Sequence, residues 1–212
     1  TVYRFLSTLC GLGYVRKRAA NEKYTLTLKF LRLSADTLSK IDIRRYARRY
    51  LEQIPKITGE TVHLVERNGN ETVYIDKFES AVNSVRMVSR VGLSLPMVYT
   101  AVGKALMSHL DDEEIRKIWD SSAVCKKTDK TITDFGVFME EIRKVRENGY
   151  AADREENEEG VCCVAAALPD VYGEYRYAFS VSAPSSRMSE EKIAEIGRLV
   201  TETAAKISCH DE

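Results

Sequence analysis

The stretch from Val161 to Leu168 constrains the fold of this chain more than any other segment. Its side chains are almost uniformly apolar, with no polar residue at alternate positions. A strand of this kind is buried on both faces of its sheet. The stretch from Tyr175 to Ala183 is its predicted partner. A sheet that is covered on both sides needs flanking helices, so the sequence predicts an α+β domain.

The segments around this sheet carry local signals for further elements. Thr61 to Glu66 and Thr72 to Lys77 alternate apolar and polar residues, and the Asn-Gly pair between them predicts a hairpin. Val82 to Val91 is predicted as a third strand. A helix over residues 41–54 should stop or kink at Pro55. Helices are also predicted over Ala101 to His109, Asp111 to Trp119, Phe135 to Asn148 with Gly149 as its cap, and Ser189 to about Ile207.

The first residues have the pattern of a helix followed by a basic hairpin. Gly11 and Gly13 should end the helix, and two short strands follow around a basic turn. This order is typical of the second half of a winged helix-turn-helix, although an ordinary amphipathic helix and hairpin explain the pattern equally well. The chain begins abruptly, so we expect a domain truncated at its N-terminus. The apolar residues expected to form one buried stripe are Val2, Phe5, Leu6 and Leu9.

Charge is distributed unevenly along a chain that is neutral overall. The first fifty residues contain twelve Lys or Arg and three Asp or Glu, a net charge of +9, which leaves −9 for the remainder. Basic side chains supply sequence-independent affinity for nucleic acid phosphates. The asymmetry therefore predicts an N-terminal part that binds a polyanion and a remainder with another role.

Composition excludes several other classes of protein. No apolar run approaches the roughly 20 residues that span a bilayer, and no secretory signal is visible, so a cytoplasmic location without membrane contact is expected. The cysteines are odd in number and lack paired spacing, which argues against a disulfide framework or a zinc site. We expect no metal and no cofactor. The cysteines are Cys10, Cys125, Cys162, Cys163 and Cys209.

Several motifs together resemble the IclR family of bacterial transcription regulators. The similarity begins with residues 1–6, 12–15 and 22–29 and continues through residues 60–64, 86–92 and 100–105 to the stretch from Gly149 to Pro184. It covers essentially the whole chain, and its motifs are specific as a set. Residues 22–29, 131–133 and 155–160 resemble most closely the KdgR-like repressors, a subgroup that controls sugar-acid catabolism and responds to 2-keto-3-deoxygluconate.

The resemblance implies an organisation in three parts. Residues 1–29 would be the C-terminal part of a winged helix-turn-helix, residues 30–40 a linker helix, and residues 41–212 a GAF/profilin-like effector-binding domain with an antiparallel sheet and flanking helices. It also implies a DNA-binding repressor that assembles as a homodimer or homotetramer. Double-stranded operator DNA and a small keto acid would be its partners.

Two serines mark the predicted effector pocket. Ser180 and Ser182 are two residues apart on a predicted strand, so both hydroxyls point to one face and suit a polyhydroxy acid. A half-exposed strand with solvent-facing serines is the alternative. The resemblance places both serines in the effector pocket, together with Asp153, for which a surface carboxylate is the other interpretation.

Further pocket positions also follow from the resemblance. Ala101 and Val102 match positions that bind the effector's acid group through the backbone, and a helix start offers free N–H groups there. Val102 is bulkier than the family's commoner small residue. Met87 and Leu95 match apolar wall positions. Cys163 matches the family's pocket cysteine and is interpreted as part of the wall, because no base lies nearby in sequence to activate it.

Other polar residues receive more ordinary interpretations. His63, between two apolar residues on a predicted strand, is interpreted as structural. Arg86 is expected to reach toward water. The acidic run 155–159 is interpreted as a solvated loop or lid, not as a metal site.

The predicted DNA contacts lie in the first part of the chain. The first helix would enter the major groove, with basic residues of the hairpin near phosphates. Two alternatives remain open, namely an enzyme that acts on a carboxylic acid through Cys163 or Asp153, and a ligand sensor without DNA binding. The predicted contacts are Thr1, Tyr3, Arg4, Lys17, Arg18 and Lys23.

Overall fold

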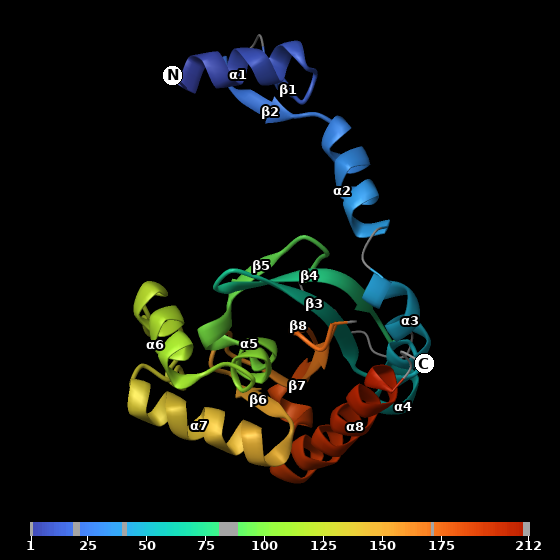
Figure 1. The fold of residues 1–212 in the computed structure, drawn as a ribbon, viewed down its shortest axis with the longest axis vertical. Helices are drawn as coiled ribbons and strands as arrows, with labels where there is room; N and C mark the ends of the chain where they lie inside the picture. The colour runs from blue at the N-terminus through green and yellow to red at the C-terminus, as the bar shows by residue number, and fades with distance from the viewer. Residues whose placement is uncertain (1, 19–21, 40–41, 81–88, 171, 210–212) are drawn as a thin grey trace. The chain divides into compact units, whose positions relative to one another are not determined.

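The fold was obtained as a computed structural model, which describes residues 2–18, 22–39, 42–80, 89–170 and 172–209. The chain divides into two compact units, Thr1–Asp42 and Ile43–Glu212 (Figure 1). The first unit contains helix α1 (Val2–Gly11), strands β1 (Val15–Lys17) and β2 (Tyr24–Leu26), and helix α2 (Lys29–Ser39).

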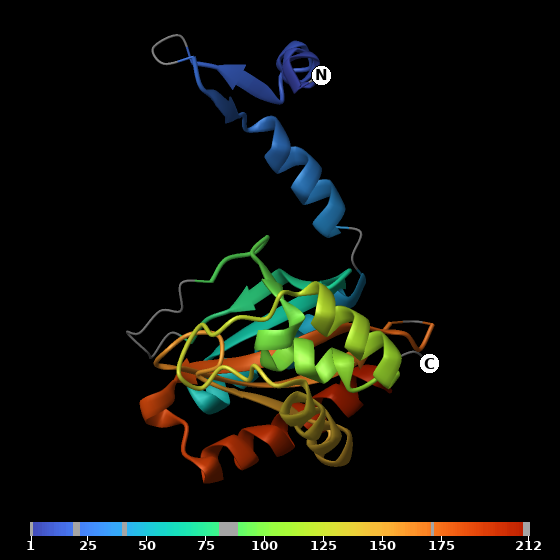
Figure 2. The ribbon, with the colours of Figure 1, turned by 90° about the vertical axis from the view of Figure 1, so that its left-hand side faces the viewer.

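The first unit is a helix beside a small antiparallel hairpin, followed by a second helix (Figure 2). The predicted order of helix and hairpin is confirmed. The buried apolar stripe on α1 is wrong, because Val2 is 73% exposed and Phe5 is 68% exposed. Among the described residues β1 is the main element packed against α1, and it leaves this face uncovered.

The second unit is built on a six-stranded antiparallel sheet in the order β5-β4-β3-β8-β7-β6. The α+β prediction is therefore confirmed. The predicted hairpin forms β3 and β4, and the long apolar stretch forms β7 beside β8. The strands are β3 (Thr61–Asn68), β4 (Glu71–Phe78), β5 (Ser94–Pro96), β6 (Ala151–Arg154), β7 (Val161–Pro169) and β8 (Tyr175–Pro184).

The helices of this unit begin and end close to the predicted residues. Asp111, Asp134 and Ser189 each accept a backbone hydrogen bond at a helix start, and Gly149 ends α7 in the left-handed conformation. The helices are α3 (Asp42–Leu51), α4 (Ile54–Thr58), the 3-10 helix η1 (Met97–Tyr99), α5 (Ala101–Met107), α6 (Asp112–Ser121), α7 (Phe135–Asn148), the 3-10 helix η2 (Ser185–Arg187) and α8 (Glu190–Ser208).

Two sequence predictions are refined by the described residues. The helix expected to stop or kink at Pro55 ends at Leu51, and a new short helix begins with Pro55 in its first turn, where the missing N–H costs no hydrogen bond. The predicted strand from Val82 to Val91 falls largely on residues outside the described ranges. Its described remainder is not a strand, and the short strand β5 follows it.

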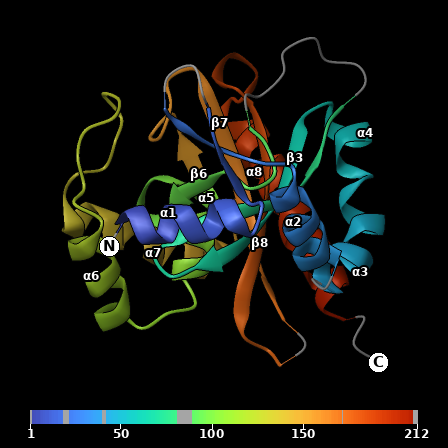
Figure 3. The ribbon, with the colours of Figure 1, turned by 90° about the horizontal axis from the view of Figure 1, so that it is seen from above.

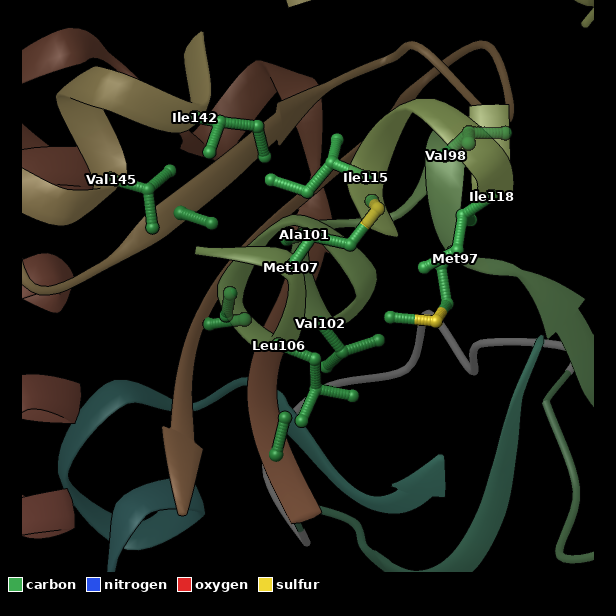
Figure 4. Close-up of a cluster of buried hydrophobic side chains, with 14 of the residues drawn as sticks. Met97, Val98, Ala101, Val102, Leu106, Met107, Ile115, Ile118, Ile142 and Val145 are labelled. Atoms are coloured by element: carbon green, nitrogen blue, oxygen red, sulfur yellow. The ribbon is translucent and has the colours of Figure 1, made fainter. Parts of the chain in front are cut away.

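Helices cover both faces of the sheet, as the apolar β7 requires. Figure 3 shows α6 and α7 on one side of the strands and α3 and α4 on the other. One core forms where α5 lies against β7 and β8, with α6 and α7 behind it (Figure 4). The other core forms where α8 packs against β7. The buried side chains of this second face include Val62, Leu64, Val164, Phe179, Val181, Ile196 and Val200.

Two local irregularities shape the first core. Gly103 of α5 lies so close to η1 that an added Cβ would be 2.0 Å from the carbonyl oxygen of Met97. Only glycine allows this approach. In the β3–β4 ladder, Leu64 pairs with Asp76 but Val65 pairs with Tyr74, so Ile75 is an extra residue in a β-bulge.

Candidate functional site

A cavity of about 110 Å³ lies between the sheet and the start of α5. This volume accommodates several water molecules or a small organic molecule. Both polar and apolar side chains line it. They are His63, Tyr74, Ser89, Leu93, Leu95, Thr100, Ala101, Val102, Asp153, Asn157, Glu158, Val161, Cys163, Ser180 and Ser182.

Strand register brings the polar groups of the cavity together. Ser182 of β8 lies opposite Cys163 of β7, and Cys163 lies opposite Asp153 of β6. In the next row Ser180 lies opposite His63 of β3. Residues directly opposite each other on antiparallel strands share a face, so these five side chains converge from four strands.

Seven of the eight effector residues predicted from the sequence line this cavity: Leu95, Ala101, Val102, Asp153, Cys163, Ser180 and Ser182. The eighth, Met87, and also Arg86, lie outside the described residues. The alternative of a solvent-facing strand is wrong, because Ser180 and Ser182 are both buried. Asp153 is likewise buried and is not a surface carboxylate.

His63 is the main group in the cavity that the sequence interpretation missed. Its Nδ1 lies 3.2 Å from Ser182 Oγ, and its Nε2 lies 2.6 Å from Ser89 Oγ. Burial, with a smaller contribution from the nearby Lys77 ammonium, lowers the pKa of His63 to about 4. The ring is therefore neutral at pH 7. Alternation along β3 could have indicated this position, since it puts Thr61, His63 and Val65 on one face.

Asp153 is the only aspartate that lines the described cavity, and its charge is unfavourable there. Burial, and next the negative charge of Glu156, raise the pKa of Asp153 to about 7. Its Oδ1 accepts a hydrogen bond of 2.7 Å from the backbone N–H of Glu156. A ligand hydroxyl or cation near this carboxyl would favour its ionised form.

Cys163 is a thiol that contributes to the cavity wall. Its Sγ donates to Ser182 Oγ at 3.1 Å. Burial, followed by the nearby charge of Asp153, raises the pKa of Cys163 well above its usual range. A nucleophilic cysteine needs a lowered pKa. The surroundings of Cys163 therefore do not activate its sulfur, and they agree with the interpretation of Cys163 as part of the cavity wall.

The start of α5 presents backbone donors to the cavity. Thr100 caps this helix, because its side chain accepts from the N–H of Gly103 at 3.1 Å. Among the described residues, the N–H groups of Ala101 and Val102 have no hydrogen-bond acceptor. Because these two residues also line the cavity, their donors are available to a bound anion.

A buried ion pair supports the cavity from behind. Lys104 of α5 has no exposed surface, and its Nζ lies 2.7 Å from Glu156 Oε1 and 2.9 Å from Oε2. The acidic run 155–159 was predicted as a solvated loop, and for Glu156 this is wrong. The carboxylate is drawn inward because it is the partner of a buried ammonium.

The loop that carries Glu156 is fastened to a neighbouring loop. Thr128 donates to the carbonyl of Glu155 at 2.6 Å, and Thr131 donates to the carbonyl of Glu156 at 2.7 Å. Lys130 forms an ion pair with Glu155. Asn157 and Glu158 of the same loop line the cavity, so its rim is held by these contacts.

The predicted DNA-contact residues lie in the first unit. Tyr3, Arg4, Lys17, Arg18 and Lys23 are exposed on α1 and around the β1–β2 turn, while Thr1 lies outside the described residues. Lys17 forms an ion pair of 3.1 Å with Glu22. The hairpin therefore places Lys17, Arg18 and Lys23 around the same turn.

The described part of the chain contains neither a membrane-spanning helix nor a cluster of metal-binding side chains. No helix there has the length and apolar character needed to cross a membrane. Nor do three or more His, Cys, Asp or Glu side chains gather there as a metal-binding group.

Comparison with known proteins places this geometry in a family. Residues 35–209 match the family model described as bacterial transcriptional regulator IclR C-terminal. The chain is 38% identical over 208 residues to the HTH-type transcriptional regulator KdgR of Escherichia coli K12, covering 98% of this chain and 79% of that protein.

Solved structures give the same result for the fold. A crystal structure of the Thermotoga maritima IclR superposes with a TM-score of 0.81 at 35% identity, covering 98% of this chain and 83% of that one. The C-terminal domain of Escherichia coli KdgR gives a TM-score of 0.70 at 32% identity, covering 80% of this chain and 98% of that domain.

The relatives decide between a regulator and an enzyme, two of the functional classes that the sequence left open. Those found are transcriptional regulators or repressors, and they match nearly the whole chain. The chain is accordingly a regulator and not an enzyme that acts on a small acid. Both the match to the family model and the identity to KdgR show that the chain belongs to the IclR family of bacterial transcriptional regulators.

Proposed function

We propose that this regulator is a repressor of sugar-acid catabolism whose effector is a hydroxylated keto acid such as 2-keto-3-deoxygluconate. In this proposal residues 1–29 bind operator DNA, residues 30–40 form a linker helix, and residues 41–212 bind the effector. The observation that carries it is the composition of the cavity, which combines two backbone donors with several hydroxyl and carboxyl groups.

The cavity offers a complementary place for each part of such an acid. The effector carboxylate would accept hydrogen bonds from the N–H groups of Ala101 and Val102, which lack other acceptors among the described residues. Its hydroxyls would bind Asp153, Ser180 and Ser182, whose side chains lie in two adjacent rows of the sheet. Leu95 and Cys163 would contact its carbon chain.

Charge supports the assignment of DNA binding to the first unit. Residues 1–42, which make up this unit, contain eight Lys or Arg and three Asp or Glu, a net charge of +5. Phosphate contacts by Arg4, Lys17, Arg18 and Lys23 would position α1 on the duplex. Relatives named as repressors support negative regulation, and a homodimer or homotetramer would read a palindromic operator.

Effector binding would shift the balance between two arrangements of the oligomer. A ligand can change an equilibrium only by its differential affinity for the two states. Couplings of this kind are typically about 1–3 kcal/mol. The expected result is weaker operator binding when the keto acid is present.

Thermal unfolding in the presence of candidate acids tests the proposal. An acid at about 100 times its dissociation constant should stabilise the protein by about 2.7 kcal/mol. We expect stabilisation by 2-keto-3-deoxygluconate, its loss in the Ser180→Ala variant, and recovery of the acid chemically unchanged. A Ser108→Ala variant, altered outside the cavity, should respond as the wild type does. No stabilisation by any acid would refute the proposed effector site.

A further inference from the structure

We infer that His63 fixes the hydroxyl of Ser182 as a hydrogen-bond acceptor toward the cavity, and thereby selects an effector that carries a hydroxyl group at that point. This inference rests on the proposed function and narrows its ligand class. It makes His63 a positioning residue, because the imidazole acts through Ser182.

A neutral imidazole has one donor nitrogen and one acceptor nitrogen. His63 is 2% exposed and lies between Ser182 and Ser89, with a heavy-atom contact on each ring nitrogen. The ring must therefore donate to one serine and accept from the other. Once the tautomer of His63 is known, the donor and the acceptor in each of these hydrogen bonds are known as well.

The tautomer of His63 follows from counting the hydrogens available to the linked side chains of Cys163, Ser182, His63 and Ser89. The Cys163 thiol donates to Ser182 Oγ. If Nε2 carries the proton, Ser182 donates to Nδ1 and Nε2 donates to Ser89, so every hydrogen except the Ser89 hydroxyl hydrogen has an acceptor. If Nδ1 carried the proton, the hydrogen without an acceptor would be on Ser182 instead.

The two serines differ in how easily they can carry an unpaired hydrogen. Ser182 is 3% exposed, whereas Ser89 is half-buried and can reach solvent. On Ser182 the unpaired hydrogen could bind only water confined in the cavity, whose ordering costs entropy, whereas Ser89 also has exposed surface. The structure therefore favours the proton on Nε2, with Ser182 donating to the ring.

The Ser182 hydroxyl can then form one further hydrogen bond. A hydroxyl has one hydrogen and two lone pairs. The hydrogen is directed to His63, and one lone pair accepts from Cys163. The second lone pair faces the cavity and can only accept, so it pairs with an effector hydroxyl. Donation to a keto or carboxylate oxygen at that position would require the other tautomer of His63.

This polarity distinguishes two classes of acid. A bare 2-oxo acid such as pyruvate has acceptor oxygens but no hydroxyl to offer to Ser182. A hydroxylated acid supplies the donor. A site built to hydrogen-bond a hydroxyl discriminates well against analogues that lack it, because the buried polar group is then left unpaired.

The tautomer can be measured directly in the wild-type protein without ligand. Nitrogen-15 NMR of the imidazole rings distinguishes a protonated nitrogen from an unprotonated one, and loss of one ring in His63→Gln assigns the signal among three histidines. We expect an unprotonated Nδ1 and a protonated Nε2. The opposite assignment would overturn the inference whatever the ligand.

Two matched variants test the consequence for selectivity. His63→Asn places an amide near the position of Nδ1 and can keep the contact with Ser182. His63→Gln reaches toward the position of Nε2 and loses that contact. The ratio of the dissociation constants of pyruvate and 2-keto-3-deoxygluconate should be similar in wild type and His63→Asn and about tenfold smaller in His63→Gln.

The outcomes separate this inference from the proposed function. An unchanged ratio in His63→Gln, with both acids bound, overturns the role of His63 and leaves the effector site in place. If neither acid binds the wild-type protein, the proposed function fails and the selectivity inference fails with it. Thermal unfolding of each free variant shows that a changed ratio comes from a folded protein.

Discussion

The Lys104 ammonium lies within 2.9 Å of both carboxylate oxygens of Glu156, and the lysine has no exposed surface. This pair joins α5, which carries Ala101 and Val102, to the loop that follows β6, the strand that carries Asp153. Removal of one partner leaves an uncompensated charge in a buried place, which costs far more than an exposed ion pair contributes.

Glu156→Gln should lower the free energy of unfolding by about 3–5 kcal/mol. The amide keeps the size of the side chain but not its charge. The lost stability therefore measures the cost of leaving the Lys104 ammonium buried without its anionic partner. Urea unfolding measures it. Glu195→Gln, which breaks the exposed pair with Lys192, is the control and should cost less than about 1 kcal/mol. Equal losses in the two variants would show that the burial of Lys104 has no energetic consequence.

Gly103→Ala should destabilise the second unit, although alanine normally favours a helix by about 1 kcal/mol over glycine. The added Cβ would lie 2.0 Å from the Met97 carbonyl oxygen and must push η1 away from α5. Overpacking of this kind costs about 1–3 kcal/mol.

Gly136→Ala on α7 is the matched control for this change. Its Cβ meets only a side-chain oxygen of Asp134 at 3.1 Å. Thermal unfolding of both variants should give opposite or clearly unequal shifts. A Gly103→Ala protein as stable as wild type would mean that the contact between η1 and α5 yields easily.

Asp153 should contribute a fall in stability as pH rises from about 4 to about 7. Its folded pKa of about 7 lies above the usual value of 3.8, so the unfolded chain releases the proton first and is favoured across that window. Below pH 4 both states hold the proton, and above pH 7 both have lost it. The slope can reach about 1.4 kcal/mol per pH unit.

Asp153→Asn should remove this contribution, because the amide does not titrate. The lowered pKa of His63 contributes a slope of opposite sign, between about pH 4 and pH 6.5, in the wild type and in the variant alike. Urea unfolding at a series of pH values compares the variant with the wild type. Glu147→Gln, on the exposed part of α7, should keep the wild-type profile. If the difference in unfolding free energy between wild type and Asp153→Asn stayed constant from pH 4 to pH 7, Asp153 would not titrate as expected.

The first unit should respond to charge changes in opposite directions. Arg18→Ala should weaken operator binding and reduce the salt dependence of the binding constant by about one contact. Glu22→Gln should strengthen binding, because it frees Lys17 from its 3.1 Å ion pair.

Both changes are measured as operator-binding constants of the Arg18→Ala and Glu22→Gln proteins at several salt concentrations. Arg143→Ala on the exposed surface of α7 should leave the binding constant and its salt slope unchanged. Parallel weakening by Arg18→Ala and Arg143→Ala would show that the hairpin has no special role.

Local signals in the sequence predicted most of the fold. The Asn-Gly pair predicted the β3–β4 hairpin, Gly149 the end of α7, and Ser189 the start of α8, because each acts within a few residues. The alternation of Ser180 and Ser182 likewise placed both serines on one face. The apolar composition of β7 predicted a sheet covered on both sides.

The remaining features depend on pairings between distant parts of the chain. His63 meets Ser182 across 119 positions, and Lys104 meets Glu156 across 52. No local pattern reveals which histidine or glutamate will be brought opposite a given partner. The stripe on α1 failed for a related reason, because periodicity shows that a face is apolar but not which element covers it.

Because of its bulge, β4 contains one residue more than the register with β3 requires. Since Leu64 pairs with Asp76 and Val65 with Tyr74, every residue except Ile75 already has its place across the ladder. The ring of Tyr74 lies against that of His63, with 4.8 Å between their centroids. A chain that lacked Ile75 could form an uninterrupted ladder with Tyr74 in its present register. Loss of Val73 would instead shift the residues before it by one place and turn each to the opposite face. Ile75 thus marks the point at which the register of this wall could be shortened, at the loss of its own side chain, which is 3% exposed, from the core.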